Sequence, residues 1–86
     1  MSSRVAVIAI IVEDPAGVDE LNHILSENSN YIIGRMGIPY RTKGINIISV
    51  AVDAPQDAIS TMTGRIGRIP GISSKTAFSQ IITENA

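Results

Sequence analysis

Two stretches of the chain are apolar at almost every position. Residues 45–52 carry no charge, and residues 4–12 are charged only at Arg4. Both stretches are short and rich in β-branched residues, which is typical of β-strands. Side chains alternate between the two sides of a strand, and neither side is polar enough here to face water. The pattern therefore predicts two central strands in a sheet that is covered on both faces.

Two other segments repeat apolar residues at intervals of three and four, which predicts amphipathic helices. The first stripe consists of Val18, Leu21, Ile24 and Leu25, and the second of Ala58, Ile59, Met62 and Ile66. A similar motif precedes each helix. Asp14 is a predicted cap with Pro15 at the first helical position, and Asp53 with Gln56 resembles a capping box. Gly67 is the predicted end of the second helix.

Two weaker strand patterns complete the set. Residues 31–38 are interrupted by Gly34 and Gly37, which often mark a bulge or a close approach by another group. Residues 72–82 follow a turn at residues 70–71 and form the most polar of the four patterns. Both patterns are therefore predicted to lie at the edges of the sheet.

The elements follow the order β-α-β-β-α-β, with a hairpin loop at residues 40–44 and a frayed tail at residues 83–86. We expect one domain over residues 1–86, of the α+β class. Right-handed crossovers favour a ferredoxin-like sandwich with antiparallel sheet order 4-1-3-2 and both helices on one face. The other face then stays bare unless a second chain covers it, which predicts a homo-oligomer, either a dimer or a tetramer.

The composition excludes several classes of function. The chain has no cysteine, which excludes disulfides, thiolate metal sites and thiol catalysis. Its net charge of −1 gives no reason to expect direct nucleic-acid binding. No run is long enough for a membrane span, so we expect a cytoplasmic protein.

His23 is the single histidine, four residues from both Asp19 and Glu27 on the first helix. Coordination of a metal across a dimer is an alternative, but a solvated surface histidine is favoured because a metal site needs three or four ligands. No motif of paired acid and base or of an activated nucleophile appears. We therefore expect no catalytic residues, no metal and no cofactor.

Two segments are candidates for ligand binding. In residues 34–40, Arg35 could clamp a carboxylate or phosphate, and Tyr40 could stack or donate a hydrogen bond. The equal alternative is a bulged strand whose glycines make room for a neighbouring subunit. At Asp14, a helix cap is favoured over ligand binding. The candidate ligand-binding residues are Asp14, Pro15, Ala16, Gly17, Val18, Arg35, Met36, Gly37 and Tyr40.

Residues 14–18 resemble the entry turn of ACT domains, which are small amino-acid-sensing modules of this topology, although ACT turns place glycine directly after proline. Over its whole length the chain resembles the small ACT-like proteins named as regulators of iron-only hydrogenase systems. Residues 34–40, 45–53 and 64–67 carry that resemblance. The fold is also similar to the tetrameric C-terminal domain of nickel-responsive repressors, but the histidines and cysteine of their nickel site have no counterpart here.

The resemblance implies a non-catalytic regulatory module, in keeping with a role in transcriptional regulation. It would be a homo-oligomer with a small-molecule effector or a protein partner at the subunit interface. Two alternatives share the topology. A phosphate-handling enzyme of the acylphosphatase type would need an anion-binding turn where Glu13 and Asp14 stand, and an RNA-binding module would need aromatic residues on the central strands.

Overall fold

The computed structural model describes the backbone of residues 2–84 and the side chains of residues 2–81. Its strands are β1 (Ser2–Val12), β2 (Ile32–Tyr40), β3 (Ile45–Ala54) and β4 (Ile72–Glu84), and its helices are α1 (Val18–Glu27) and α2 (Gln56–Gly67). Short 3-10 turns at Pro15–Gly17 and Ser29–Tyr31 flank α1. The predicted order of elements is thereby confirmed.

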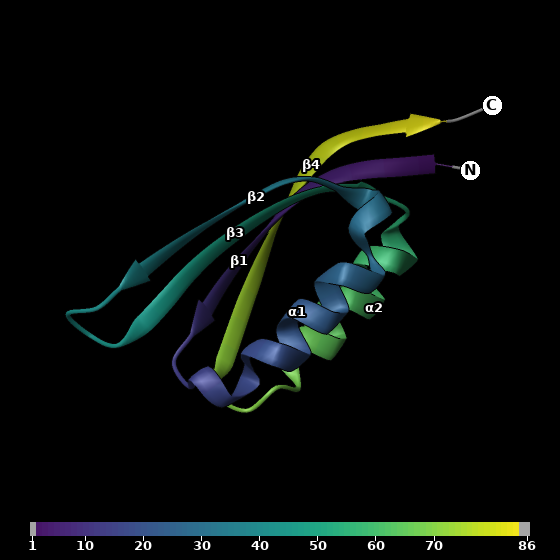
Figure 1. Cartoon of the computed structure of the whole chain (residues 1–86). Coiled ribbons are helices and arrows are strands. Elements are labelled where there is room, and N and C mark those ends of the chain that lie inside the picture. The colour runs from purple at the N-terminus through teal and green to yellow at the C-terminus, as the bar shows by residue number, and fades with distance from the viewer. Residues whose placement is uncertain (1, 85–86) are drawn as a thin grey trace.

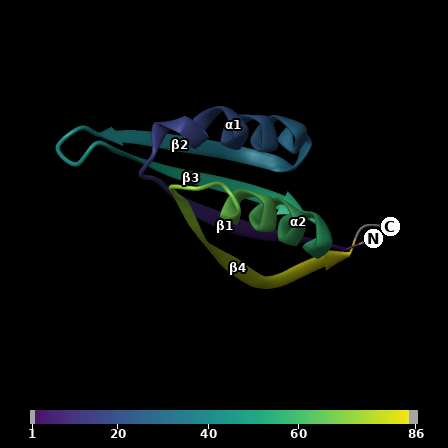
Figure 2. The ribbon, with the colours of Figure 1, turned by 90° about the horizontal axis from the view of Figure 1, so that it is seen from below.

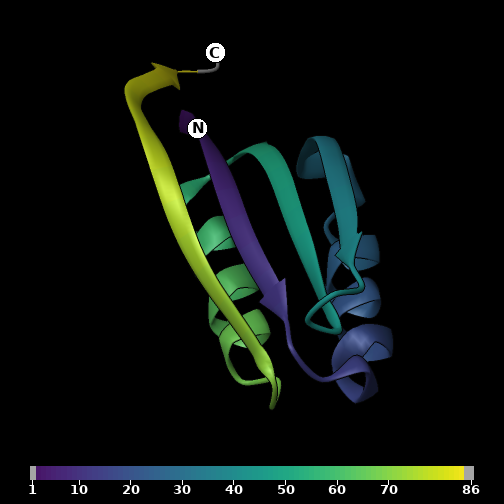
Figure 3. The same cartoon turned by 90° about the vertical axis from the view of Figure 1, so that its left-hand side faces the viewer.

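The strands form one antiparallel sheet in the order β2-β3-β1-β4, with both helices on the same side (Figure 1). Seen from below, α1 runs beside β2 and β3, and α2 runs beside β1 and β4 (Figure 2). Figure 3 looks onto the other side, where the strands lie in front of the helices. The ferredoxin-like α+β class and the central position of β1 and β3 are confirmed.

The core lies between the sheet and the helices. Every second side chain of β1, from Ala6 to Val12, points into it and is at most 2% exposed. The helical stripes meet these side chains as their spacing predicts. The buried helix residues are Leu21, Ile24 and Leu25 of α1 and Ile59, Met62 and Ile66 of α2. Burying a large aliphatic side chain of this kind contributes roughly 1.5–3 kcal/mol.

The predicted capping box at the start of α2 is wrong. Asp53 belongs to β3, which stays paired with β1 as far as Ala54. The N-cap position falls to Pro55, which has no side-chain hydrogen bond, and Gln56 instead accepts one from Arg4. Strand pairing thus holds Asp53 in extended backbone beyond the reach of the helix.

The edge strands are longer than predicted. β2 runs through Pro39 to Tyr40, and its pairing shifts register between Ile32 and Gly34, which confirms the bulge. β2 pairs only with β3, so the proline, which has no N–H to donate, sits at an edge, where it is tolerated.

β4 continues through residues expected in the tail, because Thr83 and Glu84 pair with Ser3 and Ser2. The rest of the predicted tail, Asn85 and Ala86, lies outside the described residues. Within residues 2–84, neither helix has the length and apolar character that crossing a bilayer requires.

Candidate functional site

The side of the sheet opposite the helices, which we call the open face, carries partly exposed apolar side chains. The pairing register assigns its residues, which are Val5, Val7, Ala9 and Ile11 of β1, Gly34, Met36, Ile38 and Tyr40 of β2, Ile45, Ile47, Ser49, Ala51 and Asp53 of β3, and Ser73, Lys75 and Ala77 of β4. Val7 is 41% exposed there, whereas its chain neighbour Ile8 is 0% exposed on the helix side. The open face is thus a largely apolar surface, with charges at Asp53 and Lys75, that the described part of the chain does not cover.

The open face has ridges and hollows. Val7 pairs with Ala51 on one side and Ala77 on the other, so that a larger side chain stands between two small ones. One hollow of about 280 Å³ is lined by Val7, Gly34, Arg35, Met36, Ser49 and Ala51, and another of about 190 Å³ by Ala9, Ile11, Ser73, Ser74 and Lys75. Side chains of a second sheet could interlock with this relief.

Gly34 and Gly37 in β2 are not required by packing within the chain. Neither has a positive φ, and a Cβ added at either would meet no atom within 4 Å. A larger residue would therefore fit both positions in the isolated chain. The space that they leave is available only to something outside the chain.

The turn between β1 and α1 holds the first group of predicted site residues. The Asp14 carboxylate accepts a hydrogen bond from the Ala16 N–H at 2.9 Å, so Asp14 caps the 3-10 turn rather than α1, which begins at Val18. A Cβ at Gly17 would lie 2.6 Å from Cγ2 of Ile69. Gly17 is thus fixed by close packing, and Val18 packs against the core.

A second turn, between α2 and β4, is bound to the first. The carbonyl of Gly71 accepts hydrogen bonds from the backbone N–H groups of Glu13, at 2.7 Å, and Asp14, at 3.3 Å. Gly71 has a φ of +79°, which favours glycine, and a Cβ there would clash with the Cβ of Asp14. The two turns therefore form one rigid unit at this end of the sheet.

A groove of about 510 Å³, which we call the turn groove, lies beside this unit. Its lining residues are Asp14, Ala16, Gly17, Glu20, Arg65, Arg68, Ile69 and Pro70. Three of them were predicted as site residues, and sequence reasoning missed the other five. The topology offered a signal, because Val12 pairs with Ile72 and so brings the start of α1 and the end of α2 to the same end of the sheet.

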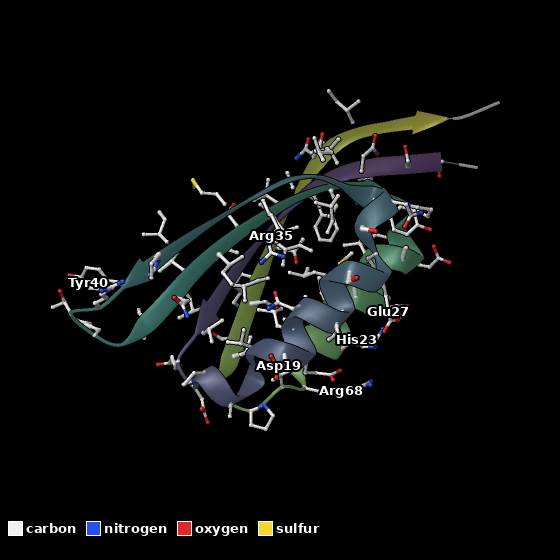
Figure 4. All side chains as sticks on the ribbon, in the orientation of Figure 1. Asp19, His23, Glu27, Arg35, Tyr40 and Arg68 are labelled. Atoms are coloured by element: carbon white, nitrogen blue, oxygen red, sulfur yellow. The ribbon has the colours of Figure 1, made fainter. Side chains whose placement is uncertain are left out.

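The remaining predicted site residues lie elsewhere. Arg35 points from β2 toward α1 (Figure 4), where it donates a 3.5 Å hydrogen bond to Asn22 beside a hollow of about 370 Å³. Met36 is on the open face, and Gly37 pairs with Ile48. Tyr40 lies by the hairpin, well apart from Arg68 in Figure 4. Within one chain the predicted residues are therefore spread over several surfaces, and Pro15 and Val18 line none of the hollows described above.

The exposed surface of α1 carries a charged cluster. Oε1 of Glu27 lies 2.7 Å from Nε2 of His23, and the Arg65 guanidinium donates two hydrogen bonds to the Glu27 carboxylate, at 3.0 and 3.2 Å. Hydrogen bonding to Arg65 lowers the pKa of Glu27 below its ordinary value of 4.5. No group of three side chains suited to metal binding occurs in the part of the chain that the structure describes.

Comparison with known proteins identifies the family. A family model described as "TM1266-like: Iron-only hydrogenase system regulator, putative" matches residues 4–76. The chain belongs to the TM1266-like family. Its fold is similar to that of the uncharacterized protein TM1266 from Thermotoga maritima, with a TM-score of 0.85 and 27% identity. That match covers 88% of the present chain and 96% of TM1266.

A more distant likeness concerns the fold alone. A formyltetrahydrofolate deformylase from Pseudomonas putida KT2440 matches with a TM-score of 0.61 and 15% identity, over 85% of the TM1266-like chain but only 28% of the enzyme. No curated protein matches the chain. The family thus supports a regulatory role.

Proposed function

We propose that the chain is a non-catalytic regulatory module of an iron-only hydrogenase system and works as a homo-oligomer. The family match supports regulation. The observation that supports assembly is the open face. Val5, Val7 and Ile47 are exposed there although they lie on β1 and β3, the two strands whose other side forms the core. Exposed apolar residues of β2 extend the same face. A small effector or a protein partner would bind between subunits, near residues 14–18 and 35–40, and bias their packing.

The size of the open face fits a subunit interface. With strands about 4.8 Å apart and about 3.3 Å per residue, four strands over some eight residues cover on the order of 500 Å² before side-chain relief is counted. The largest apolar patch on a monomer is typically about 300–600 Å² and often marks an interaction site. A stable interface buries about 800 Å² per partner, and the flat area of the open face accounts for more than half of that.

The relief of the open face suits a second copy of the same chain. In a two-fold interface each surface meets itself, so ridges must lie beside hollows of similar size. Val7 and Met36 stand next to the hollow above Gly34 and Ala51, which satisfies that condition. The missing side chain at Gly34 allows a neighbour to approach the sheet closely.

Placing a charge at the centre of the open face tests this proposal. Val7→Lys would bury an unpaired ammonium group in the interface, which is costly, while leaving the helix-covered core intact. We expect the variant to be a folded monomer by light scattering and circular dichroism at a concentration at which the wild type is assembled. The matched control is Ser60→Lys on the exposed side of α2, which should assemble normally. An assembled Val7→Lys protein would contradict the interface.

A further inference from the structure

The turn groove presents charges of both signs around an apolar floor. We propose that it binds a small dipolar molecule, with an amine at one end, a carboxylate at the other and a short alkyl chain between them. The proposal deepens the ligand-binding part of the proposed function and rests on it, but it does not depend on the assembly of subunits. It assigns roles to Glu20 and Arg68, which lie on different helices around the groove.

Some charged side chains that line the groove are already paired with an opposite charge in the chain, and others are not. Arg65 donates both of its short hydrogen bonds to Glu27, so its charge is compensated chiefly outside the groove. Glu20 and Arg68 are both exposed, and neither side chain makes a hydrogen bond or ion pair with the described residues, although Glu20 is close enough to Arg65 to help raise the pKa of that guanidinium. An acid and a base are therefore left for a ligand, one on the α1 side and one on the α2 side.

The α1 side favours an amine. Asp14 uses one carboxylate oxygen, Oδ1, to accept from the Ala16 N–H, which leaves its second oxygen for the groove that it lines. With Glu20 this side carries two acids, and like charges around one cavity attract a cation. On the α2 side, the Arg68 guanidinium offers a planar pair of donors that matches a carboxylate.

The floor between the charges is apolar and rigid. Gly17, Ile69 and Pro70 line it, and Gly17 is held against Ile69 by packing. The hydrogen bonds from Glu13 and Asp14 to Gly71 fix the position of one wall relative to the other. A volume of about 510 Å³ lies in the range of ligand pockets. An alkyl chain of a few carbons would cover this floor while its charged ends reached the two sides.

An NMR titration of the ¹⁵N-labelled 86-residue chain at low ionic strength tests the proposal. The probes are 4-aminobutanoate, 5-aminopentanoate and 6-aminohexanoate, with pentanoate and pentylamine as singly charged controls. We expect at least one amino acid of the series to shift the amides of Ala16, Gly17, Glu20 and Ile69. It should bind about tenfold more tightly than either control, since a hydrogen bond to a charged group is worth at least a factor of ten.

Two variants separate the ends of the ligand. Arg68→Gln should weaken binding of the amino acid about tenfold and leave pentylamine unaffected, whereas Glu20→Gln should weaken both. Arg41→Gln in the hairpin loop is the control and should change neither.

Equal binding of all probes, shifts outside the groove, or no binding of the series would overturn the ligand class. Light scattering on the same samples separates this result from the proposed function. An assembled chain that binds none of the probes overturns only the dipolar ligand, while a monomeric chain overturns the proposed assembly.

Discussion

The two faces of β1 are nearly equal in hydrophobicity, but the side chains of one face are buried and those of the other are exposed. Ile8 and Ile10 on the helix side are fully buried, whereas Val5 and Val7 on the open face are each 41% exposed. The helices that follow in the chain account for the first face, and nothing in the described part of the chain covers the second. Hydrophobic residues at the spacing of a strand therefore do not by themselves distinguish a face that its own helices bury from one that they leave open.

The largest loss of stability should come from truncating a core residue on the helix side of β1. Ile8→Ala removes three carbon atoms from a fully buried site and leaves a cavity, so we expect a loss of about 2–5 kcal/mol in the free energy of unfolding. Chemical denaturation followed by circular dichroism measures it. The loss should persist on dilution, because the site lies within one subunit. A loss below about 1 kcal/mol would show that the core is not packed as described.

The close contact at the start of α1 should be nearly as sensitive. Gly17→Ala would force a methyl group against Ile69 and Ile72, and we expect a cost of about 1–3 kcal/mol. Gly64→Ala is the matched control, because a Cβ there meets nothing within 4 Å. In the interior of α2 it should stabilise the chain by up to about 1 kcal/mol. The comparison fails if both substitutions shift the denaturation midpoint in the same direction.

On the open face, the effect of truncation should depend on protein concentration. Val7→Ala removes about two methyl groups' worth of apolar contact, roughly 1–2 kcal/mol, but only where a second subunit buries Val7. We expect a loss of this size in the assembled protein and a much smaller loss after dilution to monomers. Thermal denaturation over a range of concentrations measures both. A loss independent of concentration would place Val7 in the subunit's own core.

The smallest effect should come from the exposed cluster on the helices. Because Arg65 lowers the pKa of Glu27, the folded state favours the carboxylate. Its stabilisation is present above the unfolded pKa and is lost as pH falls through the folded pKa. Glu27→Gln should therefore lower the melting temperature slightly at about pH 7, and the difference should shrink as the pH falls through the lowered pKa of Glu27. Arg65→Gln should behave the same way; a difference that grows in acid would contradict the pairing.

Much of this fold could be predicted from the sequence because its signals are local. The stripe from Val18 to Leu25 needs a buried side, and the two charge-free strands need central places in the sheet. The capping box at Asp53 failed because pairing between β1 and β3, a long-range interaction, outweighed a local motif. The length of β4 was also underestimated, because Thr83 belongs to the strand through its long-range pairing with Ser3.

The candidate site was less predictable than the fold. Asp14 and Gly17 were singled out, but the turn groove needs Arg68 from the other end of the chain, and only the sheet topology places them together. Arg35 and Tyr40 were expected to line a ligand site between subunits together with the turn, which stays a prediction; within one chain Arg35 points toward α1 and Tyr40 lies on the open face. The spacing of residues along the sequence does not show which side chains of distant elements lie close together in the fold.

Sedimentation equilibrium of the wild-type chain, from millimolar to submicromolar concentration, tests the central claim most directly. The open face predicts a dimer or larger assembly at micromolar concentration that dissociates on dilution. A chain that remains monomeric at the highest concentration, with its circular dichroism and cooperative unfolding intact, would show that the sheet needs no second copy. That result would contradict the interface and the regulatory mechanism built on it.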